Sequence, residues 1–383
     1  MILQVKDLKD AATKILASID NGALLDKVKD TLEIVSANKV LQLNVTNKEY
    51  YVRVKVPLVS EENFRALVDA KLFLNLISKT TVDEVELKTT QTSLIVKANG
   101  TYKLPFIYDG NDVINLPEIK IENKTLEFNM TSDALNSIAN VNSKELDIAA
   151  AKRDYQKVYY IDEQGCLTFS TGACMNHSFT LPNKVVFLLN DKTVKLLKLF
   201  KSGDVKFSLG MDAYGNQVLT KVKFENDDVE ITAITPTTQA LIDSVSSRVA
   251  RARSTLTKNY ANVVYLDKNE LLEAITRLLV YTYAIGGMYV DYAYVTFDPT
   301  TGLTISSLDY NSKEQLPLLT RDGEQSHVVE TYNTVMDIKQ LKTTLSACDE
   351  DAIQLRFEDH QGMLLLRKTI FNFVPEAEGT SGN

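Results

Sequence analysis

The chain has few of the residues that build metal sites or disulfide frameworks. It contains three cysteines and three histidines in 383 residues, and no two cysteines stand at C-x-x-C spacing. No histidine stands at metal-ligand spacing from another histidine or from a cysteine. Paired cysteines mark disulfide-stapled secreted domains, and clustered cysteines and histidines mark zinc sites. The sequence therefore predicts reduced thiols, no bound metal and no other cofactor.

Long apolar runs are also missing. No stretch approaches the roughly 20 apolar residues that a helix needs to cross a bilayer. The opening segment MILQVKDLKDAATKI is amphipathic and mixed in charge. It lacks the continuous apolar core of a secretion signal. We therefore expect a cytoplasmic protein.

The motifs of the common enzyme classes are absent as well. The sequence has no GxxxxGK[ST] phosphate loop, no GxGxxG after a strand, no HExxH and no GxSxG. The acidic run Asp349-Glu350-Asp351 stands between a predicted helix and a predicted strand, which is typical of a turn. Polymerases, nucleases and helicases need metal-binding carboxylates or a phosphate loop. The sequence favours a non-catalytic binding protein and leaves open an enzyme of unrecognised type.

The sequence does contain one pattern three times. Each copy is an amphipathic helix followed by two short strands, with a lysine just after a good N-cap residue. The three helices are VDAKLFLNLISK (68–79), LNDKTVKLLKLF (189–200) and MDIKQLKTTLSA (336–347). A short strand followed by an amphipathic helix recurs upstream of each, at 3–16, 128–141 and 264–279.

Alternating strands lie between the two helices of each copy. Val52, Val54 and Val56 alternate with Arg53 and Lys55, which predicts a half-buried antiparallel strand. We therefore expect an α+β fold of three repeated domains, each with two helices packed on antiparallel sheets. Linkers are predicted near 115–124 and 236–253, which gives domains 1–118, 119–246 and 247–375 and a disordered polar tail, 376–383.

Positive charge is concentrated locally, although the net charge of −8 should repel DNA from the chain as a whole. The helix 189–200 carries lysines three residues apart, opposite Val194, Leu197 and Phe200. Most such runs are only solvated helix faces, but here a lysine recurs on the equivalent helix of each repeat. This favours a surface that attracts phosphates without reading base sequence. The lysine stripe comprises Lys192, Lys195, Lys198 and Lys201, and the residues predicted to contact DNA on this surface are Lys71, Lys192, Lys195, Lys198, Lys339 and Arg248.

The order of these segments resembles the bacterial beta sliding clamp, the processivity subunit of the replicative DNA polymerase. The resemblance extends to about residue 375 and rests on order and spacing more than on any single motif. The segments that carry it are MILQVKDLKDAATKI, LEIVSANKVLQLNV, NGTYKLPFIYDGNDVINLPEI, RDYQKVYYIDEQGCLTFSTG and TVMDIKQLKTTLSACDEDAIQLRF.

The resemblance implies a head-to-tail homodimer that closes as a ring around double-stranded DNA, with the helices lining the hole. It implies a DNA polymerase and a clamp loader as partners, held through a hydrophobic peptide-binding cleft. By position, Tyr159 and Tyr160 match residues beside the duplex. The cleft would be formed by Ile161, Thr171, Ala173, Cys174, Met175, Phe371 and Phe373. The dimer interface would contain Phe106, Tyr108, Leu278 and Tyr281.

The sequence departs from the family around that cleft. STGACMNHSF and FNFVPEAEGTSGN replace the family's segments, and LTKNYANVV stands where the family has a proline-containing entry to its third domain. The departure favours a phage- or plasmid-encoded clamp with its own polymerase. A scaffold or inhibitor that copies the clamp shape without encircling DNA is the alternative.

Overall fold

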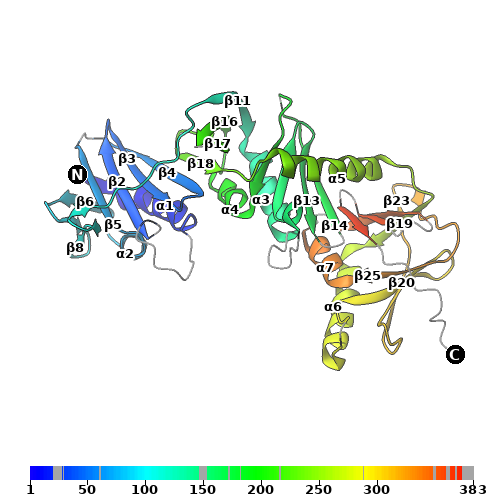
Figure 1. The fold of residues 1–383 in the computed structure, drawn as a ribbon. Helices are drawn as coiled ribbons and strands as arrows, with labels where there is room; N and C mark the ends of the chain where they lie inside the picture. Colours follow the sequence, from blue (N-terminus) through cyan, green and yellow to red (C-terminus); the bar gives the residue numbers. More distant parts are fainter. Residues whose placement is uncertain are drawn as a thin grey trace. The chain divides into compact units, whose positions relative to one another are not determined.

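The computed structural model describes residues 1–19, 28, 30–59, 62–145, 153–170, 173–181, 183–214, 217–287, 289–347, 351–358, 363–366 and 369–372. The chain divides into two compact units, which are described separately (Figure 1). Unit 1 comprises Met1–Ala139 and Lys192–Thr237, and unit 2 comprises Asn140–Asp191 and Thr238–Asn383.

Unit 1 contains a four-stranded and an eight-stranded antiparallel sheet. The four-stranded sheet has the order β1 (Ile2–Gln4), β6 (Glu84–Thr89), β7 (Ser93–Lys97), β8 (Thr101–Pro105). The eight-stranded sheet has the order β11 (Lys124–Thr131), β16 (Asp204–Tyr214), β17 (Gln217–Glu225), β18 (Val229–Ile234), β4 (Tyr50–Pro57), β3 (Val40–Thr46), β2 (Thr31–Ala37), β5 (Phe64–Asp69). A short hairpin, β9 (Tyr108–Asp109) and β10 (Asp112–Val113), follows β8.

Unit 2 is built in the same way. Its eight-stranded sheet has the order β15 (Phe187–Asn190), β12 (Val158–Asp162), β13 (Gly165–Ser170), β14 (Ala173–Ser178), β28 (Thr369–Asn372), β27 (Met363–Leu366), β26 (Ala352–Phe357), β19 (Asn262–Asp267). Its four-stranded sheet has the order β22 (Lys313–Leu316), β21 (Gly302–Ser306), β20 (Tyr292–Asp298), β25 (Tyr332–Asp337). The hairpin of β23 (Thr320–Arg321) and β24 (Glu324–Gln325) forms a two-stranded sheet, and the residues beside it make isolated bridges to β19.

Several helices begin where the sequence supplies N-cap acceptors. The α-helices are α1 (Val5–Leu16), α2 (Ala70–Ser78), α3 (Ser132–Glu145), α4 (Asp191–Leu196), α5 (Gln239–Thr257), α6 (Lys268–Ile285) and α7 (Ile338–Ala347). Short 3₁₀ helices are η1 (Asp154–Gln156) and η2 (Leu197–Leu199). Asp69 accepts a hydrogen bond from the Leu72 amide at 2.7 Å, and Asp337 accepts one from the Gln340 amide at 2.8 Å. These contacts satisfy amides that a helix N-terminus otherwise leaves unbonded, and they confirm the predicted starts of α2 and α7.

The strand order confirms the predicted three-fold repeat. The series β1-β6-β7-β8, β11-β16-β17-β18 and β19-β26-β27-β28 each begin with the strand that leads into the first helix of a repeat. The series β5-β2-β3-β4, β15-β12-β13-β14 and β25-β20-β21-β22 each begin with the strand that leads into the second helix. The fold class is therefore α+β as predicted, and the exact domain boundaries stay a prediction.

Apolar helix faces form the cores. In unit 1, Leu8 and Ile15 of α1 and Phe73 and Ile77 of α2 are fully buried, and α1 packs on β3 and β4. Burying such a side chain contributes about 1.5–3 kcal/mol. The amphipathic character predicted for the helix in 3–16 is thus confirmed, but Leu16, which its spacing also assigned to the buried face, is 48% exposed.

The predicted linker 236–253 is instead most of a helix. Helix α5 buries Val245, Val249 and Ala252 against the rest of unit 2. These residues are four and three positions apart, which is the spacing of one helical face. Thr238 caps it by accepting a hydrogen bond from the Leu241 amide at 3.3 Å. The predicted boundary at 246/247 thus falls inside α5. The polar tail 376–383 lies outside the described residues.

Candidate nucleic-acid interface and subunit edges

Four lysines line one side of the segment formed by α4, η2 and the residues after it. Lys192, Lys195, Lys198 and Lys201 are exposed, whereas Val194, Leu197 and Phe200 are fully buried. An α-helix turns by 3.6 residues, so a three-residue spacing drifts around its axis. The chain changes to a 3₁₀ helix at Leu197–Leu199 and becomes extended at Phe200. The segment exposes all four lysines while it buries the apolar residues between them.

Lys71 and Lys339 occupy the corresponding place in the other two repeats. Each is exposed and stands two residues after the aspartate that caps its helix, Asp69 for α2 and Asp337 for α7. We call these two residues and the four lysines of the α4–η2 segment the helix lysines. Phosphate contact by point charges of this kind gives affinity without sequence specificity.

Carboxylates stand close to several helix lysines. Lys192 lies 3.5 Å from Glu49 and Lys339 lies 3.5 Å from Asp291. Lys201 lies 3.3 Å from Asp10, which also bonds Lys14 of α1 at 2.9 Å. The hydrogen bond from Lys14, aided by Lys201, lowers the pKa of Asp10 despite the opposing effect of burial.

The tyrosine pair predicted to contact DNA is buried. Tyr159 is fully inaccessible and Tyr160 is 5% exposed. Tyr159 donates a hydrogen bond to Asp191 at 3.1 Å, and burial raises its pKa. Tyr160 belongs to the cluster under α5. Since β12 is covered on both faces, neither ring supplies surface for a duplex in this structure.

Arg248 has a different environment from the helix lysines. It lies on the exposed side of α5, and its guanidinium carbon stands 4.1 Å from the ring centre of Tyr155. This is a cation–π contact, which holds the side chain against unit 2. Its predicted role at DNA stays a prediction.

The residues predicted to form a partner cleft are covered where the structure describes their side chains. Ile161, Ala173, Cys174 and Met175 are 2%, 6%, 8% and 7% exposed. Ala173 joins the core below α6 and α7, whereas Cys174 joins the cluster under α5. Burial raises the pKa of Cys174 to about 12, so this thiol stays protonated.

Of the remaining predicted cleft residues, the structure describes only the backbone of Phe371. The backbone of Phe371 pairs with that of Ala173 between β28 and β14. Thr171 and Phe373 lie outside the described residues.

Helix α5 is the feature that sequence reasoning missed here. Its signal was present, because Leu241, Val245, Val249 and Ala252 recur at helical spacing.

The predicted interface residues divide into surface and core. Phe106 and Tyr108, which follow β8, are half-buried. Tyr281 is also half-buried and donates a hydrogen bond to Asp309 at 3.2 Å. Leu278 is 1% exposed in the core of unit 2, which fits the packing role that its helical spacing also allowed.

Two strand pairs join segments that are distant in sequence. In unit 1, β18 pairs with β4, and in unit 2, β14 pairs with β28. Among the described strands, β8 and β22 are the outermost strands of their sheets at the corresponding positions. An outermost strand presents unbonded amide and carbonyl groups, which is how one chain can extend a sheet with another.

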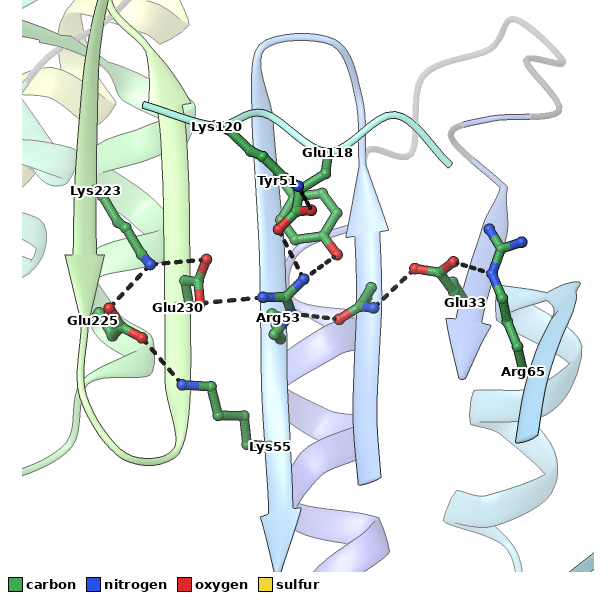
Figure 2. A network of polar contacts seen from close by, with 11 residues as sticks. Glu33, Tyr51, Arg53, Lys55, Arg65, Glu118, Lys120, Lys223, Glu225 and Glu230 are labelled. Atoms are coloured by element: carbon green, nitrogen blue, oxygen red, sulfur yellow. Dashed lines mark hydrogen bonds and ion pairs between the residues drawn. The ribbon is translucent and has the colours of Figure 1, made fainter. Parts of the chain in front are cut away.

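A polar network crosses the β18–β4 junction (Figure 2). Arg53 of β4 bonds Glu230 of β18 at 3.4 Å and Glu118 at 2.9 Å. It also donates to the Tyr51 hydroxyl at 3.0 Å. The guanidinium group thus ties the two strands to the segment that connects β10 with β11.

The network continues on both sides of Arg53, as Figure 2 shows. On β17, Lys223 bonds Glu230 at 3.2 Å and Glu225 at 3.0 Å, and Glu225 also bonds Lys55 of β4 at 3.2 Å. Beneath Glu118 and Lys120 lies a cavity of about 330 Å³ with lysines and glutamates in its wall. The sequence showed Arg53 and Lys55 as the polar side of a strand but gave no sign of their partners on β17 and β18.

Neither a scan of family models nor a search of curated protein sequences finds a match to the chain. Solved structures of one class match it over nearly its whole length, and that class is the beta sliding clamp of bacterial DNA polymerase III. The chain thus has the fold that the sequence resemblance implied.

Three of these structures illustrate the likeness. The beta subunit from Pseudomonas aeruginosa has a TM-score of 0.77 at 13% identity, over 98% of this chain and 99% of that one. The beta subunit from Thermotoga maritima has a TM-score of 0.73 at 13% identity, over 98% and 99%. The sliding clamp from Bacillus subtilis has a TM-score of 0.71 at 13% identity, over 98% of each chain.

Within the described residues, no group of three or more histidine, cysteine, aspartate or glutamate side chains is placed to hold a metal ion. No helix in the same part of the chain is long and apolar enough to cross a membrane.

Proposed function

We propose that this protein is a DNA sliding clamp, a non-catalytic processivity factor that encircles duplex DNA. The observation that carries the proposal is the three-fold repeat itself. Every repeat places an exposed lysine at the start of its second helix, and the complete chain has the clamp fold. Weak, sequence-independent contact is what a sliding protein requires, because tight contact with particular phosphates would hold it in place.

The sheet edges support a homodimer. The β18–β4 and β14–β28 junctions each join the last strand of one four-strand series to the last strand of the other. Strands β8 and β22 are the remaining pair of such series ends. Pairing β8 of one copy with β22 of a second copy would repeat the same junction between chains. A head-to-tail contact of this kind closes into a ring when the rotation per copy returns to the start.

Closure of the ring accounts for long residence without tight binding. A closed ring is linked to DNA topologically, so a tethered polymerase stays near its template at high effective concentration. The partners are then a DNA polymerase and a clamp loader that opens one interface, in a bacterial cytoplasm or, for a phage protein, in that of its host. The partner cleft is proposed beside α5, since α5 covers Cys174, one of its predicted wall residues.

The first experiment tests assembly and topology without a loader. Native mass measurement should give a particle of twice 42.8 kDa. The protein is then incubated with an open-ended duplex biotinylated at both ends, and streptavidin is added to block the ends. Retention in 1 M salt, followed by release after restriction cleavage, is the expected result. Retention that cleavage does not reverse would contradict encirclement, and a dimer with no retention would favour a clamp-shaped scaffold.

A further inference from the structure

Three helix lysines already have a carboxylate partner. Lys192 faces Glu49 at 3.5 Å, Lys201 faces Asp10 at 3.3 Å, and Lys339 faces Asp291 at 3.5 Å. The pattern occurs in both units. It involves the same lysines that the proposed function assigns to phosphate contact.

These ion pairs have long contact distances and are exposed to solvent. The lysine side chains are 47–68% exposed and the carboxylates 31–52% exposed. Their distances exceed those of charge-assisted hydrogen bonds, which are about 2.7–2.9 Å. Exposed pairs of this kind contribute little to stability, since water solvates both partners. They can therefore exchange partners at small cost.

Asp10 shows the arrangement most clearly. Its two oxygens contact Lys14 of α1 at 2.9 Å and Lys201 at 3.3 Å, so one carboxylate lies between lysines from two elements. A phosphate group also offers anionic oxygens to two ammonium groups at once. Asp10 thus competes with a backbone phosphate for Lys201. Lys14, whose side chain is only 12% exposed, holds the carboxylate in place at 2.9 Å rather than reaching a phosphate itself.

We propose that Asp10 and Glu49 act as resident competitors for the DNA phosphates. Each holds a helix lysine while no phosphate is within reach and takes it back when the phosphate moves on. The inference rests on the proposed function. This competition explains why the affinity for DNA stays low although the helix lysines face the DNA. Each new phosphate contact requires the loss of an existing ion pair. Asp291 has the same relation to Lys339.

The test is the full-length double variant Asp10→Asn and Glu49→Gln, with an open-ended DNA duplex as the probe. The affinity is measured by fluorescence anisotropy between 50 and 200 mM salt. Each lysine that gains a phosphate contact steepens the slope of log K against log salt by about 0.9. We expect a slope steeper by about 1–2 and an affinity about 3- to 10-fold higher at the lowest salt.

A matched control removes two carboxylates of unit 1 that also bridge lysines but lie on strands. Glu86 contacts Lys88 at 2.6 Å and Lys97 at 2.9 Å, and its pKa is lowered to about 2 by these hydrogen bonds. Glu127 likewise bonds both Lys124 and Lys206. The double variant Glu86→Gln and Glu127→Gln changes the net charge by the same amount. It should leave the slope unchanged, since its lysines are not helix lysines.

Three outcomes are decisive. A slope equal to that of the unchanged protein, or equal gains in test and control variants, overturns the competitor role while leaving the clamp function intact. Absence of any salt-dependent DNA binding by the unchanged protein overturns the proposed function and this inference with it. Thermal unfolding at the unchanged temperature shows that the variants fold, and Asp10→Glu, which keeps the charge, should restore the original slope.

Discussion

Arg53 of β4 lies directly opposite Glu230 of β18, with 3.4 Å between the guanidinium nitrogen and the carboxylate oxygen. The two residues are 177 positions apart in the chain, and they meet because two four-strand series of one repeated design join at this point. Figure 2 shows that Arg53 also contacts Glu118 above the strands. This contact links the backbone ladder of the junction to the connecting segment over it.

Replacing Arg53 should weaken unit 1. The side chain of Glu230 is only 8% exposed, so Arg53→Met leaves a buried carboxylate with Lys223 as its one remaining cation partner among the described residues. Removing one partner of a buried pair destabilises because the other charge stays desolvated. We expect a loss of about 2 kcal/mol, measured by urea unfolding. Lys120→Met is the control: its side chain is 69% exposed and it should change stability by less than about 0.5 kcal/mol.

Blocking the outer edge of β8 should prevent dimer formation. The Phe106 amide donates to the Thr92 carbonyl and the Ala98 amide to the Gly100 carbonyl, so even-numbered residues of β8 bond to β7. In an antiparallel ladder the bonding direction alternates, and the amide of Lys103 therefore points away from β7. Lys103→Pro removes that donor without removing a bond to β7. Native mass should fall from two copies to one, whereas Lys103→Thr, which keeps the amide, should stay dimeric.

Removing a single helix lysine should change the salt dependence of DNA binding more than the fold. Lys198 is exposed and follows Leu197 at the start of the 3₁₀ segment. Lys198→Ala should reduce the slope of log K against log salt by about 0.9, equally for duplexes of different sequence. Lys120→Ala, on the sheet face that carries Arg53, should leave the slope as it is. A sequence-dependent loss would argue against a sliding contact.

Acid should loosen the start of β11 through Asp212. Burial raises the pKa of this carboxyl, but hydrogen bonds from Lys221 and from the Asn123 and Glu122 amides outweigh burial and lower it. A carboxyl whose pKa is lowered by folding stabilises above its unfolded pKa of about 3.9, and this contribution is lost as the pH falls through the folded value.

The measurement for Asp212 is urea unfolding as a function of pH. Asp212→Asn should lower stability at pH 7 and flatten the decline below about pH 4. Lys221→Met should reproduce part of the loss at neutral pH, because Lys221 contacts Asp212 at 2.8 Å. An unchanged acid profile in Asp212→Asn would remove this carboxyl as a cause of acid sensitivity.

Local patterns in the sequence predicted the helices and strands well. Asp69 and Asp337 are capping residues in the structure, as their type and position indicated, and Val52, Val54 and Val56 are buried on the strand where they alternate with charges. These features depend on residues within one or two turns of each other. A single sequence contains that information directly.

Features that depend on distant partners were not accessible in the same way. Tyr159 and Tyr160 were matched to residues beside DNA by family resemblance. Adjacent residues of a strand face opposite sides, so one of them is expected in the core, but the burial of Tyr160 depends on α5, some 80 residues later. The same applies to Cys174, which looked like a cleft wall and lies under Val245 and Val249 in one cluster. The family resemblance matched positions along the chain, whereas the burial of Tyr160 and Cys174 depends on their packing against α5.

The outermost strands β8 and β22 have a consequence for mixtures of altered and unaltered copies. A copy with a blocked β8 still offers an intact β22, so it can join the β8 edge of a normal copy. In the resulting pair, β22 of the normal copy is free, but the only β8 edge left to receive it is the blocked one. The ring therefore cannot close. Such a variant should therefore be dominant over the normal protein when both are expressed together, because each altered copy withdraws a normal one from closed assemblies.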